Sequence, residues 1–313
     1  MATSRKLMAL TVIAVLLVAG LGAVVILSMN NNKNDTKPVD QSTTVSVVDD
    51  RGVNVTVPKY PQHILSLGTA FTECLYAIGA QDQIAGVDST SKYPAEVANK
   101  TNIGSGYTIN KESVTMLQPD LVIMWKSYTT TLKTLTEMNL TVLAFDPQSV
   151  ADVEKMINLL GNVTGKTGEA NLVVTDMQTR ITEVQQKVAN TTSRPNVYME
   201  LLSSGGKSPG PGTMTDDVIR LSGGYNINAN TSARYTKLNA EYVVGQDPKF
   251  IVLETQNTKT NDDVKSTSGY GTISAVVNDK IMRVDGAWLT ASPRIVLAVE
   301  EFASWFHPEL FPA

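Results

Sequence analysis

Residues 110–125 read NKESVTMLQPDLVIMW, and residues 239–253 repeat the same pattern as NAEYVVGQDPKFIVL. Each copy reads as an N-capping Asn, a Glu in the first helical turn, a short helix, a turn with Pro and a buried apolar strand. Because Glu112 and Glu241 are 129 positions apart (241 minus 112), the spacing is too wide for a solenoid repeat. The repeat indicates two similar α/β lobes, and a pair of lobes usually binds a ligand between them.

Strand and helix patterns alternate along the rest of the chain, which predicts α/β lobes with mostly parallel sheets covered by helices. One stretch without Pro, Thr167–Asn190, has apolar residues at helical spacing and predicts one long helix that joins the lobes. We place the N-terminal lobe at 45–165, the inter-lobe helix at 166–192 and the C-terminal lobe at 193–313.

The N-terminal segment has a different character. An uncharged apolar run, Leu7–Met29, follows Arg5 and Lys6 and is long enough to cross a hydrocarbon core of about 30 Å. The positive flank predicts a single-pass membrane anchor (residues 1–29) with the folded part on the extracytoplasmic side. A cleavable signal peptide is the alternative, although its apolar region would be shorter. Residues 30–44 are polar and predict a flexible linker.

Composition excludes several functional classes. The net charge is −4, and no Lys/Arg cluster follows residue 6, so nucleic acid is not an expected partner. The single cysteine, Cys74, lies in a helical pattern and is expected to be a buried structural thiol. With only His63 and His307, neither a metal site made from His and Cys nor Ser–His catalysis is expected, and we predict a binding protein rather than an enzyme.

Seven Asn-x-Ser/Thr sequons agree with a glycosylated extracytoplasmic protein. They lie at Asn34, Asn54, Asn99, Asn139, Asn162, Asn190 and Asn230.

Four aromatic residues fall in loops or at strand ends, where ligands of parallel α/β sheets bind. They are Trp125, Tyr235, Trp288 and Tyr93, two from each lobe, and together they would suit a large flat ligand. Each alone could equally be a core or stray surface aromatic.

Glu112 and Glu241 fall at the second position of their helices. A favourable contact with the helix dipole would explain either one. Two exposed acids at equal offsets also suit docking onto a two-fold partner with two basic sites, which is the interpretation we favour.

From about Pro61 to Phe311 the chain resembles the class III solute-binding proteins of ABC importers, which capture cobalamin, haem and ferric siderophores. The stretches that carry the resemblance are 64–73 (ILSLGTAFTE), 118–125 (QPDLVIMW), 211–224 (PGTMTDDVIRLSGG), 291–294 (ASPR) and 307–311 (HPELF).

The resemblance implies two lobes joined by one long helix, with the ligand between them. It implies that Glu112 and Glu241 pair with arginines of a permease dimer, which works with ATPase subunits. Trp125 and Tyr235 stand where cobalamin-binding members contact the corrin, although Tyr235 replaces a Trp. Trp288 lies in a loop where further contacts occur. The chain lacks the N-terminal Cys to which many members attach a lipid.

We therefore expect the membrane-tethered receptor of an ABC importer for a metal chelate, cobalamin or a ferric siderophore, with no cofactor of its own. An extracytoplasmic enzyme or chelatase on the same scaffold, and a surface sensor, remain the alternatives. The sequence does not identify the chelate.

Overall fold

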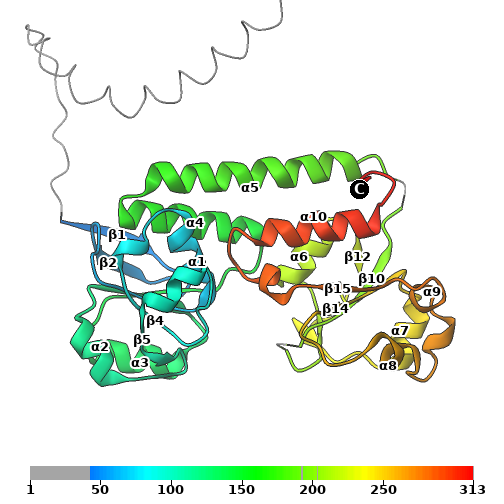
Figure 1. Ribbon diagram of the computed structural model, residues 1–313, viewed down its shortest axis with the longest axis horizontal. Helices are drawn as coiled ribbons and strands as arrows, with labels where there is room; N and C mark the ends of the chain where they lie inside the picture. Colours follow the sequence, from blue (N-terminus) through cyan, green and yellow to red (C-terminus); the bar gives the residue numbers. More distant parts are fainter. Residues whose placement is uncertain (1–42, 192, 203, 313) are drawn as a thin grey trace, which may run out of the picture. The chain divides into compact units, whose positions relative to one another are not determined.

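The computed structural model describes residues 43–312 apart from positions 192 and 203, and this described part of the chain forms one compact unit (Figure 1). The predicted anchor, the linker up to residue 42 and the sequon at Asn34 lie outside the described residues. Among the helices of the described part, none is both long and apolar enough to cross a membrane.

The N-terminal half contains a five-stranded sheet in the order β5-β4-β3-β8-β9, and all of its strand pairs are parallel. The strands are β3 (Ile64–Leu67), β4 (Ile84–Val87), β5 (Thr101–Asn102), β8 (Leu121–Trp125) and β9 (Val142–Phe145). The helical elements are α1 (Thr69–Ala77), η1 (Gln81–Gln83), η2 (Ala95–Asn99), α2 (Lys111–Leu117), α3 (Thr129–Glu137) and α4 (Val150–Thr164). Two hairpins complete this half: β1 (Thr44–Val48) with β2 (Asn54–Pro58), and β6 (Gly104–Ser105) with β7 (Thr108–Ile109).

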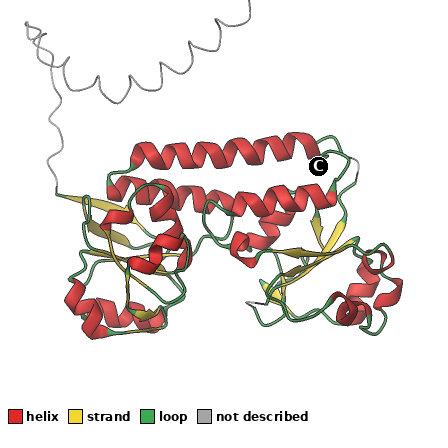
Figure 2. Cartoon of the chain, viewed as in Figure 1, coloured by secondary structure: helices red, strands yellow, loops and turns green. Residues whose placement is uncertain are grey.

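The C-terminal half contains a four-stranded parallel sheet in the order β12-β10-β14-β15. The strands are β10 (Asn196–Glu200), β12 (Tyr225–Asn226), β14 (Phe250–Glu254) and β15 (Ile281–Val284). The helical elements are α6 (Met214–Leu221), α7 (Ala240–Gln246), α8 (Asn261–Lys265), η3 (Tyr270–Thr272), α9 (Ser274–Val277), η4 (Gly286–Leu289) and α10 (Ile295–Phe306). Figure 2 shows helices around both sheets, so the predicted α/β class with parallel sheets is confirmed.

The repeated stretches 110–125 and 239–253 form the same structure twice. The Asn110 side chain accepts a hydrogen bond from the Ser113 amide at 3.0 Å, and the Asn239 side chain accepts one from the Tyr242 amide at 2.8 Å. Both helices end at a left-handed residue, Gln118 and Asp247, before the chain enters a buried strand. Local capping and turn chemistry therefore explains why both copies fold alike.

The predicted long helix is α5 (Thr167–Val188), which ends two residues before the expected Asn190. It has 22 residues, so it is roughly 33 Å long. It contacts α4 of the N-terminal half and α10 of the C-terminal half, and Figure 1 shows it crossing both. Its buried residues recur at helical spacing: Ala170, Val174, Met177, Ile181 and Val184.

Cys74 is fully buried in α1, as expected. Burial, with a smaller contribution from the neighbouring Glu73 carboxylate, raises the pKa of the thiol, so the reactive thiolate is disfavoured. The sequence predicted that Tyr235 lies in a loop, but the structure places it in a short strand. It lies in β13 (Tyr235–Thr236), which pairs with β11 (Ser208–Pro209), and the Gly/Pro-rich loop before α6 contributes that partner strand.

Candidate functional site

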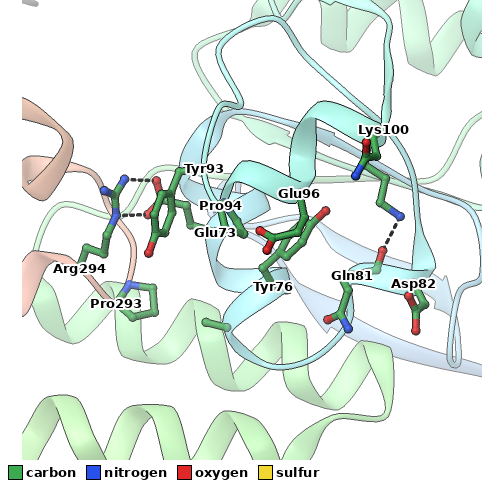
Figure 3. A pocket seen from close by; sticks show the side chains of 12 residues that line it. Glu73, Tyr76, Gln81, Asp82, Tyr93, Pro94, Glu96, Lys100, Pro293 and Arg294 are labelled. Atoms are coloured by element: carbon green, nitrogen blue, oxygen red, sulfur yellow. Dashed lines mark hydrogen bonds and ion pairs between the residues drawn. The ribbon is translucent and has the colours of Figure 1, made fainter.

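The two halves meet through a buried carboxylate. Glu73 lies in α1, whose residues from Ala70 to Leu75 are all buried, so its side chain is enclosed although it is charged. The Ser292 hydroxyl donates to Glu73 Oε2 at 2.7 Å, and Arg294 Nε donates to the same oxygen at 2.9 Å. Arg294 Nη2 bonds Glu73 Oε1, so the guanidinium binds the carboxylate through both oxygens (Figure 3).

Tyr93 contacts the same guanidinium. The loop after β4 carries Tyr93 ahead of Pro94, and the Arg294 guanidinium carbon lies 4.0 Å from the centre of the Tyr93 ring. This distance is that of a cation–π contact. The hydrogen bond to Glu73 is the main cause that raises the pKa of Arg294, so the group remains charged. The guanidinium therefore binds a carboxylate and an aromatic ring of the N-terminal half.

A cavity of about 790 Å³ opens beside this contact (Figure 3). Its volume is in the range of small-molecule sites. The N-terminal half supplies most of the wall, and Pro293 and Arg294 supply the part from the C-terminal half. Burial, then the Glu96 and Asp82 carboxylates, raises the pKa of the Tyr76 hydroxyl in this wall. Tyr93 lines this cavity, whereas Trp125, Tyr235 and Trp288 are not part of its lining.

Trp125 is the last residue of β8, at the carboxyl end of the N-terminal sheet as the sequence predicted. Its ring centre lies 4.7 Å from that of Phe71 in α1. Gly68, directly before α1, faces the indole so closely that an added Cβ would lie 2.5 Å from Trp125 Nε1. The indole is partly buried, and its role as a ligand contact stays a prediction.

The two aromatics of the C-terminal half have different surroundings. Tyr235 is 40% exposed on β13, and the Arg234 guanidinium lies 6.0 Å from its ring centre. Trp288 lies in η4, where the Asp285 side chain accepts a hydrogen bond from the Ala287 amide, and its partly buried ring packs against the core. Both remain predicted ligand contacts.

Glu112 and Glu241 are exposed at the second position of α2 and α7. Neither carboxylate has a hydrogen bond or ion pair within the described part of the chain. Figure 1 places α2 and α7 at the ends of the two halves that lie away from α5. Both side chains are therefore free for a partner.

Metal-binding groups are scarce. In residues 43–312, apart from 192 and 203, no cluster of three or more His, Cys, Asp or Glu side chains could hold a metal ion. His63 is exposed beside the Gln118 carbonyl, and His307 is buried against Gly223.

Sequence reasoning missed the Glu73–Arg294 pair. Both residues lie in stretches that carry the resemblance, 64–73 and 291–294, and that was the only signal that pointed to them.

The family model described as "Periplasmic binding protein" matches residues 64–287. The chain therefore belongs to the periplasmic binding protein family, in the class III group that the resemblance indicated.

Two relatives match along most of their length. The "uncharacterized ABC transporter substrate-binding lipoprotein YvrC" of Bacillus subtilis is 30% identical over 277 residues, which cover 85% of this chain and 87% of the relative. A "cobalamin-binding protein" of Halobacterium salinarum is 28% identical over 286 residues, covering 85% of this chain and 75% of the relative.

Solved structures share the fold. The periplasmic vitamin B12 binding protein BtuF of Vibrio cholerae superposes with a TM-score of 0.70 at 22% identity, covering 82% of this chain and all (100%) of that one.

Proposed function

We propose that this chain is the extracytoplasmic substrate-binding component of an ABC importer, and that its ligand is a metal chelate of the corrinoid, haem or ferric siderophore class. The observation that carries the proposal is the match, over 85% of the chain, to relatives named for ABC transport and for cobalamin binding. The two halves, each with its own parallel sheet, support it because this architecture offers a ligand two opposed walls.

In this proposal the halves act as the two lobes, 45–165 and 193–313, joined by the helix in 166–192. The aromatic rings of Trp125, Tyr235, Trp288 and Tyr93 contact the flat ligand and exclude water from it. The metal arrives already chelated, since the described residues offer no cluster of ligating side chains for a bare ion. The protein supplies binding rather than covalent chemistry.

Delivery requires a second contact. Glu112 and Glu241 dock onto two basic sites of a permease dimer, whose ATPase subunits drive release. Their matched positions, and the absence of partners for them among residues 43–312 as described, support this role, since a free carboxylate can pair with an arginine without first breaking another bond. The apolar run Leu7–Met29 anchors the chain in the membrane, so the receptor stays near its permease.

A charge reversal tests the docking step. Glu112→Arg and Glu241→Arg place a positive charge against a basic site, so uptake should fall at least tenfold while the Kd for ligand stays unchanged. Uptake of labelled cobalamin is measured in cells that carry each variant in place of the natural chain.

Glu183→Arg is the matched control, because Glu183 is exposed on α5 and the substitution changes the charge equally. Uptake should be normal in that variant. Loss of ligand binding in Glu112→Arg, or equal transport defects in all three variants, would contradict the docking assignment.

A further inference from the structure

We propose that Glu73, Ser292 and Arg294 are positioning residues that hold the two halves at a fixed separation, and thereby set the spacing between Glu112 and Glu241. The consequence for docking rests on the proposed function. The separation itself is a property of the ligand-free chain and can be measured without a ligand or a permease.

The Glu73–Arg294 ion pair is largely buried. The Glu73 side chain is 2% exposed and the Arg294 side chain 20% exposed, so water screens their attraction far less than it screens a surface pair. Three donors from residues 292–294 satisfy the carboxylate. Moving the halves apart would break all three hydrogen bonds at once. In the arrangement of the structure, each of the two charges has a partner.

Among the described residues, the other polar links between the halves are single contacts. Beside Glu73, the Cys74 thiol lies 3.9 Å from the Ala291 carbonyl, which is a long and weak contact. Elsewhere the Val150 amide donates to Asp217 in α6 at 2.9 Å, a single bond between the halves. The Tyr93 ring also lies against the face of the Arg294 guanidinium and restricts rotation of that group. The Glu73–Arg294 pair is therefore the most constrained of these polar contacts between the halves.

The position of the contact amplifies any relative movement of the two halves. Arg294 lies at the start of α10 and shares a groove with residues 172–180 of α5, while Figure 1 shows α2 and α7 at the ends of the halves away from α5. A small rotation at the contact therefore moves Glu112 and Glu241 further than it moves the contact itself. A permease dimer presents its two sites at one spacing, so a preset distance lowers the cost of docking.

Distance measurement between two spin labels tests the proposal. The labels are attached to Thr115→Cys in α2 and Gly245→Cys in α7 of the full chain, and both positions are exposed. A side chain at Gly245 meets open space. Cys74 stays in place because its buried thiol does not react with the label.

The distance distribution is compared in the natural chain and in Glu73→Met/Arg294→Met. The double variant removes both charges together, and apolar side chains of similar size keep the fold, because replacing a whole buried ion pair is often neutral for stability. Arg180→Met/Glu300→Met is the matched control. It removes another ion pair in which the guanidinium donates two hydrogen bonds to one carboxylate, from Arg180 Nε and Nη2 to Glu300 at 2.8 and 2.6 Å. This pair links α5 to α10 and does not involve α1.

We expect one narrow distance in the natural chain and in the control, and a wider distribution with a shifted mean in Glu73→Met/Arg294→Met. Arg294→Lys keeps the positive charge but cannot donate two parallel hydrogen bonds to the carboxylate, so it should give a distance distribution of intermediate width. This variant replaces the double variant in the test if the double variant does not fold. The proposal would be overturned if Glu73→Met/Arg294→Met and Arg294→Lys both gave the distance distribution of the natural chain and also unfolded at its temperature. If the natural chain gave a narrow distance distribution but bound none of the metal chelates, the proposed function would be refuted while this inference would stand.

Discussion

At the scale of single residues, the contact between Gly68 and Trp125 shows how a backbone position controls a candidate ligand contact. Gly68 has φ 139°, a conformation that side chains strongly disfavour, and it also faces the indole. The indole can lie over this position only because no Cβ is present. A glycine directly before α1 thus fixes where the Trp125 ring stands.

Gly68→Ala should displace the Trp125 ring, shift tryptophan emission and weaken ligand binding by about tenfold or more. The Cβ would stand 2.5 Å from the indole nitrogen, closer than real contacts allow. Fluorescence spectra and ligand titration measure both effects.

Gly79→Ala is the matched control, since Gly79 also has positive φ (71°) but its added Cβ meets no atom within 4 Å. Both variants should lose about 1–3 kcal/mol of stability through backbone strain. Only Gly68→Ala should change emission and affinity, and equal ligand affinity in the two variants would contradict the assignment of Trp125.

At the scale of elements, the local signals of the sequence predicted the repeat, because a cap, a turn and a strand depend on neighbouring residues. The α5 boundaries were predicted within two residues for the same reason. The β11–β13 pairing was missed because strands of two residues carry no periodic pattern. The Glu73–Arg294 pair was missed because its partners are 221 positions apart, and composition gives no sign of such a contact.

The end of α7 carries a carboxylate that makes stability depend on pH. Asp247 accepts hydrogen bonds from Lys249 Nζ at 2.8 Å and from the Ser274 amide at 2.7 Å, and it thereby ties α7 to α9. These bonds, with that from the Ser274 hydroxyl, lower the pKa of Asp247 to about 2. An unfolded Asp has a pKa of about 3.9. The stabilisation is therefore complete above pH about 4 and is lost as the pH falls towards about 2.

Asp247→Asn should destabilise the protein at pH 6 and reduce the further loss of stability between pH about 4 and about 2. Unfolding by urea at a series of pH values measures this dependence. Asp262→Asn, at an exposed acid in the first turn of α8, is the control and should follow the natural chain. Identical acid profiles for Asp247→Asn and the natural chain would show that Asp247 does not cause this dependence.

At the scale of the whole molecule, each half has its own parallel sheet, α5 contacts both halves, and a buried ion pair links them. Family membership and the fold agree with the resemblance that the sequence showed. The identity of the ligand depends on how side chains from both halves combine around it, and no local sequence pattern specifies that combination. Binding to a metal chelate is the central claim.

Tryptophan fluorescence of the purified full chain, titrated with cobalamin, haem and several ferric siderophores, tests this claim most directly. Free tryptophan amide corrects for light absorbed by the ligands, and Trp125→Phe identifies the responding residue among the three tryptophans. We predict saturable quenching at submicromolar concentration by one of these chelates, most of it lost in Trp125→Phe. Absence of saturable quenching across the panel, in folded protein whose binding is also undetectable by calorimetry, would contradict the account.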